Sequence, residues 1–417
     1  MRVSLEGVVG LTFSILLFAA VLLNSSGCAG KVQAADLMDG ISAQAVQGKP
    51  IDARFIENTA DFSLELFRAT IDAAENSLVS PLSVLLALGM TANGAATETL
   101  AQMEAVLGNS IPLAELNAYL YTYVEGLPSR EKVNLNIANS IWFRENLAVE
   151  KDFLQTNADY YGAAAYKSAF DQQTIQDVNN WVEENTRGMI DKILEEIAPD
   201  AIMYLINAIA FEGEWEEQYS EESIFQDEFH AQDGGRQMVD FMRSSESKYL
   251  DDGRATGFIK PYADGDYSFV ALLPKEGVSL QEYIDGLTGQ KFLETINSAR
   301  EISVAAILPK FSYEYTVQMN DALKEMGMPA AFSRYEADFS RIAPGDNIYI
   351  GEVLHKTFIS VDDKGTKAAA VTKVEMRLTS LPMETITVKL DRPFLYAIID
   401  NATNLPIFIG TVLEIQN

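Results

Sequence analysis

Apolar residues recur at helical spacing in the first half of the chain. The segments "TADFSLELFRATIDAAEN" (59–76) and "SPLSVLLALGMTANGA" (80–95) place them three and four residues apart, which predicts two helices. Pro81 stands one residue inside the second segment, where the first turn of a helix accepts proline. The segment "VNNWVEENTRGMIDKILEEI" (178–197) predicts a further helix.

Strand patterns dominate the second half. "VNLNIANSIWF" (133–143) alternates apolar residues with asparagines, which predicts a strand with one buried face. "IMYLINAIAFEGEW" (202–215) is almost entirely apolar, and "YSFVALLPKEG" (267–277) ends in a proline turn. These patterns predict an α+β fold, with helices mostly in the N-terminal half around a large sheet.

A long connection separates two strand-like runs near the C-terminus. "TFISV" (357–361) and "TITVKL" (385–390) are joined by the 23 residues 362–384. Connections in compact domains are usually only a few residues long, and longer ones are either functional or disordered. This segment is therefore a candidate functional loop.

The loop has two different faces when it is read with a period of two. One face is small or apolar and uncharged, and the other carries the charges, as expected for a strand with one buried face. Its alanines, however, favour a helix slightly. A segment that can be loop, helix or strand suits a conformational switch. The uncharged face comprises Thr366, Ala368, Ala370, Thr372, Val374 and Met376, and the other comprises Lys367, Ala369, Val371, Lys373, Glu375 and Arg377.

Composition excludes several kinds of partner and site. The chain has 417 residues, 48% of them hydrophobic, so it can bury a large core. Its formal net charge of -29 argues against nucleic acid as a partner. One cysteine and two histidines exclude an intrachain disulfide and a His- or Cys-rich metal site. We expect no metal and no cofactor.

The sequence gives little support to an enzyme. It contains no nucleophile elbow, no H-E-x-x-H motif, no phosphate-binding loop and no dinucleotide-binding glycine motif. The many carboxylates show no spacing that singles out an acid–base pair.

The N-terminus has the features of an export signal. An apolar run of 16 residues (8–23) is short for a membrane span but suits a signal peptide. "SSGC" follows, and Cys28 stands where a bacterial lipoprotein is cut and lipidated, although Ser25 occupies a position where leucine is usual. We therefore expect a lipoprotein signal over 1–27 and a tether over 28–54. The alternative is ordinary secretion with an incidental cysteine. The protein is expected to be lipid-anchored on the cell envelope, or otherwise extracellular or periplasmic.

Several motifs resemble the serpin family in family order, from about residue 55 to 414. "DDKGTKAAAVT" (362–372) resembles the hinge of the reactive loop in inhibitory serpins. "VKLDRPFLYAI" (388–398) resembles the C-terminal signature of the family, and "LPIFIGTV" (405–412) its last strand. Further matches are "SPLSV", "INAIAFEGEW", "LPKFSYEY" and "VLHKTFISVDDKGT". The resemblance implies a serpin domain over 55–417, a reactive loop at about 362–384, and a bacterial, lipoprotein-like member of the inhibitory type.

The resemblance implies a suicide inhibitor of serine proteases, and cysteine proteases are a further class of target. In that family the protease cuts the exposed loop and forms an acyl ester, and the freed limb then inserts into the large sheet as a new strand. In the uncut loop, position 366 is expected at or near the surface. The hinge positions implied by the resemblance are Gly365, Thr366, Ala368, Ala369 and Ala370. The polar and aromatic positions implied around the opening of the sheet are Ser80, Ser83, Asn207, His355, Trp215, Lys310 and Asp363.

The length of the loop resembles that of antithrombin-like loops and places the cut bond at Thr379–Ser380. A threonine there suits elastase-like or subtilisin-like serine proteases. Arg377 would suit trypsin-like enzymes, and Met376 or Leu378 chymotrypsin-like ones, so these positions stay open as alternatives.

Two other expectations concern partners. Residues 113–132 contain only Arg130 and Lys132 as basic residues beside several acids, so no glycosaminoglycan site is expected. We expect a monomer that contacts a membrane only through an N-terminal lipid. A non-inhibitory serpin that acts as a binding or chaperone module is the alternative function, and an unrelated exported enzyme is a third.

Overall fold

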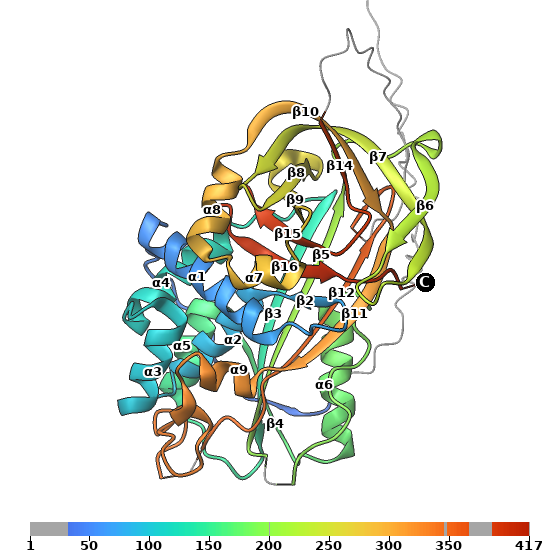
Figure 1. Cartoon of the computed structure of the whole chain (residues 1–417). Helices are drawn as coiled ribbons and strands as arrows, with labels where there is room; N and C mark the ends of the chain where they lie inside the picture. The colour runs from blue at the N-terminus through green and yellow to red at the C-terminus, as the bar shows by residue number, and fades with distance from the viewer. Residues whose placement is uncertain (1–31, 200, 346–347, 367–385, 417) are drawn as a thin grey trace, which may run out of the picture.

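The computed structural model describes residues 32–199, 201–345, 348–366 and 386–416 (Figure 1). They form an α+β fold in which most helices come first in the chain, as the sequence predicts. The α-helices are α1 (Ala53–Thr70), α2 (Pro81–Ala92), α3 (Thr97–Gly108), α4 (Leu113–Gly126), α5 (Lys151–Tyr161), α6 (Gln172–Asn185), α7 (Leu280–Asp285), α8 (Gly289–Asn297) and α9 (Asn320–Glu325).

A seven-stranded sheet runs through the molecule in the order β1-β4-β3-β5-β13-β12-β11. Its strands β5 and β12 are each antiparallel to the very short β13 between them, so they are parallel to each other. The strands are β1 (Ala35–Asp36), β3 (Val133–Arg144), β4 (Ala164–Ser168), β5 (Met203–Glu214), β11 (Phe311–Gln318), β12 (Leu354–Val361) and β13 (Gly365–Thr366).

A second sheet has the order β14-β10-β7-β8-β9-β15-β16-β2, with β6 added beside β7. Trp215, just beyond β5, forms an isolated bridge to Tyr262, just beyond β8, and so joins the two sheets. The strands are β2 (Ser77–Val79), β6 (Ile224–His230), β7 (Arg236–Asp251), β8 (Ala255–Pro261), β9 (Tyr267–Pro274), β10 (Arg300–Pro309), β14 (Ile386–Lys389), β15 (Phe394–Asp400) and β16 (Pro406–Val412).

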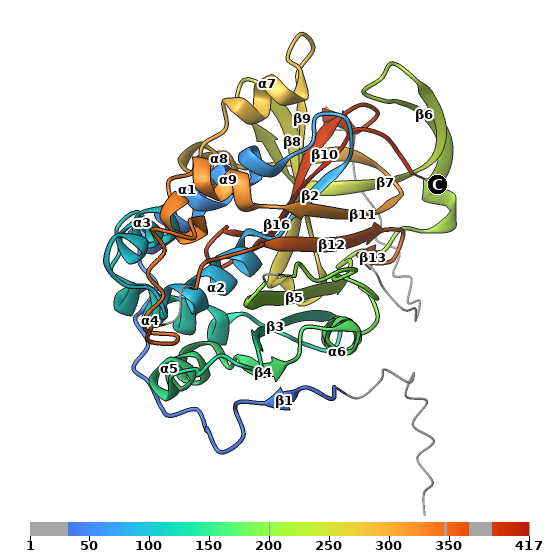
Figure 2. The same ribbon diagram turned by 90° about the horizontal axis from the view of Figure 1, so that it is seen from below.

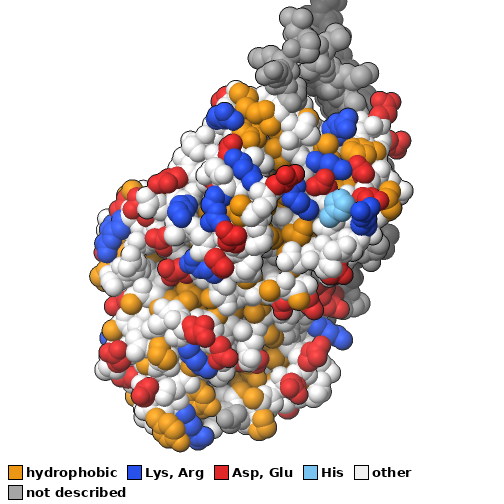
Figure 3. Space-filling model, viewed as in Figure 1, with side chains coloured by type: hydrophobic (Ala, Val, Ile, Leu, Met, Phe, Trp, Pro, Cys, Tyr) orange, Lys and Arg blue, Asp and Glu red, His pale blue; other side chains and the backbone are white. Residues whose placement is uncertain are grey.

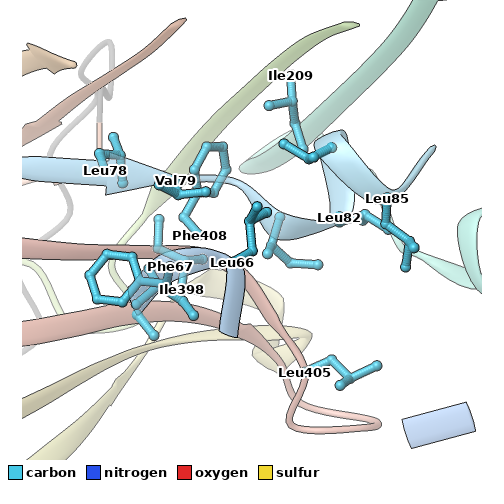
Figure 4. Packing of buried hydrophobic residues seen from close by; sticks show 14 of the residues in the cluster. Leu66, Phe67, Leu78, Val79, Leu82, Leu85, Ile209, Ile398, Leu405 and Phe408 are labelled. Atoms are coloured by element: carbon cyan, nitrogen blue, oxygen red, sulfur yellow. The ribbon is translucent and has the colours of Figure 1, made fainter. Parts of the chain in front are cut away.

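The seven-stranded sheet is covered on both faces. Leu205 and Ile209 of β5 belong to the main core, whereas Tyr204 and Ile206 belong to a smaller core under α6. This explains why β5 is apolar at nearly every position, since alternate residues enter different cores. Figure 4 shows the main core, where side chains of α1, α2, β2, β5, β15 and β16 meet.

Most predicted elements form with shifted ends. The helix predicted over 59–76 occupies 53–70 instead, because Asp52 caps its start by accepting a hydrogen bond from the Phe55 N–H. The helix predicted over 178–197 begins earlier, at Gln172, behind a capping box at Asp171. It ends at Asn185, and the prediction of helix up to 197 is wrong, because the next turn has left-handed backbone at Arg187 and Gly188.

The segment expected to be a free tether packs against the domain from residue 34 onward. β1 pairs with β4, and the Ala34 N–H donates to Asp177 of α6 at 2.8 Å. The Gln44 N–H donates to Asp159 of α5, and the Lys49 N–H to the carbonyl of Ala118 of α4. The tether expectation is therefore wrong for the described residues 34–52. Its physical reason is the unpaired edge of β4, which β1 covers.

The surface carries both signs of charge. On the face seen in Figure 3, acidic and basic side chains are interspersed, and the described part of that face has no extended basic patch. Within the described ranges, no helix is long and apolar enough to cross a membrane.

Candidate functional site

The start of the long loop already lies inside the seven-stranded sheet. Gly365 and Thr366 form β13, which pairs with Glu214 and Gly213 of β5 on one side and with Val361 of β12 on the other. Figure 2 shows β13 beside the ends of these two strands. In the described part of the chain, β5 and β12 are joined through β13 alone.

Thr366 is buried, so the expectation that position 366 lies at or near the surface is wrong. Its side chain is 3% exposed, and its hydroxyl lies 2.6 Å from the Tyr262 hydroxyl. The pairing with β5 and β12 turns this side chain toward the main core. The period-two reading assigned Thr366 to the inward face, and the structure buries it on that face before any cleavage.

Gly365 allows the loop to approach β5 closely. A Cβ atom at this position would lie 1.9 Å from the carbonyl oxygen of Gly213. Backbone atoms cannot move away from such a contact without breaking the ladder, so any side chain here would push β13 out of the sheet.

Residues 362–366, which we call the hinge turn, are braced by their own side chain and by the neighbouring strand end. The carboxylate of Asp362 accepts hydrogen bonds from the N–H groups of Lys364 and Gly365 at 2.8 and 3.1 Å. The Asp362 N–H donates to the Gly365 carbonyl at 2.9 Å and closes the turn. The turn is therefore preformed in the register that β13 needs.

Residues 213–219, which we call the support segment, hold the hinge turn from the β5 side. Trp215 donates twice, from its backbone N–H to the Lys364 carbonyl at 2.8 Å and from its indole Nε1 to the Asp362 carbonyl at 2.9 Å. The Tyr219 N–H donates to the Asp363 carbonyl at 3.0 Å. The Trp215 ring stacks on Tyr262 with the planes 12° apart. The carbonyls of residues 362, 363 and 364 thus all accept hydrogen bonds from the support segment.

The predicted ion pair between Lys310 and Asp363 is present on the other side. Lys310 Nζ lies 2.5 Å from the carboxylate, with both side chains about 30% exposed. Partial burial alone would raise the pKa of Asp363, but hydrogen bonds from Lys310 and the backbone, together with the charges of Lys310 and Lys364, lower the pKa below its usual value. Exposed pairs of this kind typically stabilise a protein by 1 kcal/mol or less.

The polar residues predicted around the opening of the sheet also come together. Ser80 caps α2, and its N–H donates to His355 Nε2 at 3.1 Å. Ser83 of α2 bonds to Asn207 of β5, which in turn bonds to Asn139 of β3. The chain of contacts joins α2 to β3, β5 and β12.

His355 of β12 is buried and neutral. Burial lowers its pKa from the ordinary value of 6.5 to about 4, because the protonated ring would lose its water. Protonation of Nε2 would also remove the lone pair that accepts the Ser80 N–H.

A groove marks the far end of the gap between β5 and β12. It has a volume of about 770 Å³ and is lined by Met203 and Tyr204 of β5 and by Leu354 and Lys356 of β12, among others. The gap therefore runs from the hinge turn at one end to an open groove at the other.

The remaining predicted site residues lie outside the described residues. They are Cys28, Ala368, Ala369, Ala370, Met376, Arg377, Leu378, Thr379 and Ser380.

Sequence reasoning missed Tyr262, Tyr219 and Lys260, which pack around Trp215. Tyr262 stacks on Trp215 across an isolated bridge between the two sheets, and only the tertiary pairing reveals that contact. The lysine in the apolar strand "ATGFIKP" could have indicated a buried ion pair, because lysine is almost never fully buried without a partner.

We predict that the His355 ring stays neutral down to about pH 4. The chain has two histidines, so one His230→Asn variant assigns both ring signals in a proton NMR titration. Since the pKa is lowered on folding, this residue contributes stability above pH 6.5 that is lost as the pH falls toward 4. The loss at pH 4 should be about 3 kcal/mol, and His355→Gln should lack it in denaturant unfolding. A ring that titrates near 6.5 in the folded protein would contradict this.

Comparison with known proteins places this site in a family. The family model for serpins (serine protease inhibitors) matches residues 57–415. Iripin-2 of Ixodes ricinus is 30% identical over 374 residues, which cover 87% of this chain and 94% of that protein. The fold is also that of thyroxine-binding globulin in its complex with thyroxine, with a TM-score of 0.77, 24% identity, and coverage of 87% of this chain and 99% of that one.

The thermophilic serpin Tengpin is similar in two states. Its native-state crystal structure has a TM-score of 0.89 and 57% identity, and covers 92% of this chain and 100% of that one. Its latent-state structure has a TM-score of 0.80 and 55% identity, over 89% and 100% of the two chains. The structure described here is thus closer to the native state of that relative. The chain belongs to the serpin family.

Proposed function

We propose that this protein is an irreversible suicide inhibitor of serine proteases that works by loop cleavage and strand insertion. The observation that carries the proposal is β13, in which the first two residues of the hinge are already paired between β5 and β12. Both flanking strands are paired on their outer sides, β5 with β3 and β12 with β11. We propose that the freed limb continues β13 and pairs with the inner edges of these two strands.

The register of β13 specifies how the loop would continue. Thr366 is opposite Gly213 and Val361, and each further loop residue moves one position back along both strands. Six residues on, Thr372 would be opposite Asn207 (213 − 6) and His355 (361 − 6). These two residues belong to the polar cluster under the sheet. The threonine hydroxyl would therefore meet polar partners, and the smaller alanines would pass between the strands before it.

The continuing strand would reach the end of β5 at Met376, opposite Met203 (213 − 10). A strand of that length adds about ten ladder hydrogen bonds, each worth about 0.5–1.5 kcal/mol. Their sum is comparable with the stability of a whole domain, about 5–15 kcal/mol. Insertion of the cleaved loop can therefore supply enough free energy to displace the bound protease, and we expect it only after cleavage.

The chemistry uses the target's own serine. Its hydroxyl attacks the carbonyl of Thr379, the bond to the Ser380 nitrogen breaks, and an acyl ester joins the protease to the inhibitor. Insertion of the freed limb then moves the ester before water can hydrolyse it. The small residue at 379 favours elastase-like or subtilisin-like proteases, and Arg377 adds a second bait for trypsin-like ones.

We place the protein outside the cytoplasm on the basis of residues 1–28, and we propose that lipid on Cys28 holds it on the cell envelope. The basis is the apolar run that ends just before "SSGC". The described chain packs against the domain from Val32 onward.

An elastase-like or subtilisin-like protease is expected to cut after Thr379 and to remain bound. Incubation with a panel of serine proteases should give a complex that survives denaturing electrophoresis. Mass spectrometry should find a released peptide that begins at Ser380. A peptide that begins only at other residues would refute the Thr379 site, and cleavage by every protease without any stable complex would favour the non-inhibitory alternative.

Thr366→Arg is expected to turn the inhibitor into a substrate. The guanidinium cannot be accommodated against Tyr262, so β13 should leave the sheet and insertion should begin late. Each 1.4 kcal/mol added to the insertion barrier slows that step about tenfold. We expect at least tenfold more inhibitor cleaved per protease trapped.

Lys367→Arg is the control for this variant. The alternation places position 367 on the opposite face, so inhibition should be unchanged. Equal stoichiometry for Thr366→Arg and the wild type would disprove the role of β13 as the start of insertion.

Cys28→Ala should release the protein from the membrane fraction and alter cleavage of its signal. Fractionation of expressing cells, with intact mass measurement of the mature protein, tests this. An unchanged distribution between fractions would leave ordinary secretion as the explanation.

A further inference from the structure

A buried lysine lies beneath the support segment. Lys260 of β8 is 1% exposed, and its ammonium lies 3.0 Å from the carboxylate of Glu246 of β7, which is 8% exposed. The same ammonium donates to the carbonyl of Glu217 at 3.1 Å. It also lies 4.5 Å from the centre of the Tyr219 ring and 5.3 Å from that of Trp215.

The contacts of Lys260 with residues 215–219 connect it to the hinge turn. Trp215 and Tyr219, whose rings face the ammonium, are the two residues that donate to the carbonyls of 362–364. Glu217 lies between them in the chain, and its carbonyl is fixed by Lys260. One buried cation thus holds the support segment at three points, and that segment holds the hinge turn at three others.

Stability alone does not explain the pair. Removing two charges from water is costly, and a buried ion pair is often no more stabilising than apolar residues of the same volume. The pair instead fixes the positions of the surrounding groups, because an ammonium binds acceptors and ring faces only in definite geometries. Ser244 completes the arrangement by donating to the Glu246 carboxylate at 2.5 Å.

We propose that Lys260, paired with Glu246, is a positioning residue for strand insertion, which it controls by holding residues 215–219 against the hinge turn. It sets the register in which β13 starts. Without it, the hinge turn would still form but would sample other positions, and insertion after cleavage would start late.

The test is a neutral replacement of the pair, Lys260→Met with Glu246→Gln, which leaves no orphaned charge. The matched control is Lys275→Met with Asp251→Asn, which removes an ion pair of 2.7 Å between the far end of β7 and the residue after β9. Hydrogen exchange followed by mass spectrometry reports on peptides that cover 213–219 and 361–366. Exchange in both peptides should become at least tenfold faster in the first variant and stay unchanged in the control.

The second readout is the number of inhibitor molecules consumed per protease trapped. This arm rests on the proposed inhibitory function. We expect at least a threefold increase for the Lys260 variant, with the rate of loop cleavage unchanged because the loop itself is intact. A merely structural role would not separate these two quantities.

Unchanged exchange in the hinge peptides would overturn the proposal, and so would faster exchange with unchanged stoichiometry. If the wild type traps no protease, the proposed function fails, while the exchange experiment still decides whether Lys260 positions the hinge turn. Should the double variant not fold, Tyr219→Leu removes one ring from the ammonium and keeps the ion pair. It should accelerate exchange in the same peptides, and no acceleration would count against the proposal.

Discussion

The pairing of β5 with β12 through the two-residue strand β13 is the constraint on which the rest of the described structure depends. Both strands carry full ladders on their outer sides, and in the described residues only β13 bridges their inner edges. Buried backbone groups need hydrogen-bond partners, so such an edge favours any strand that can reach it. The fold holds the first two residues of such a strand, Gly365 and Thr366, in place between β5 and β12.

The two ends of the region between β5 and β12 are stabilised by different kinds of interaction. At the hinge turn, backbone carbonyls accept hydrogen bonds from Trp215 and Tyr219 under a buried ion pair. At the other end of β12, neutral polar groups from α2 and the strands bond to one another around His355. The first arrangement fixes where a strand begins, and the second offers it a polar partner part way along. Together they make insertion directional.

Much of the site could be predicted because it depends on short local patterns. The alternation after Gly365 indicated a latent strand although the alanines favoured a helix, and the hinge residues and those that bond under the sheet were identified from the serpin resemblance. Element ends were predicted less well, since the capping at Asp52 and the left-handed turn after α6 override periodicity. The packing of residues 34–52 could not be read from a stretch rich in alanine, glutamine and glycine. The partners of Ala34, Ala35 and Gln44 lie more than a hundred residues away on α6, β4 and α5, and that of Lys49 lies on α4.

The sequence by itself determined that the chain resembles serpins and that it has a long, two-faced connection near its C-terminus, because those features reside in motifs, spacing and alternation. Only the tertiary structure decided that Thr366 is already buried and that Tyr262 and Lys260 belong to the site. A side chain's burial depends on which strands approach it from elsewhere in the chain. For Thr366 those strands are β5, some 150 residues earlier, and β12, which the hinge turn folds back against it.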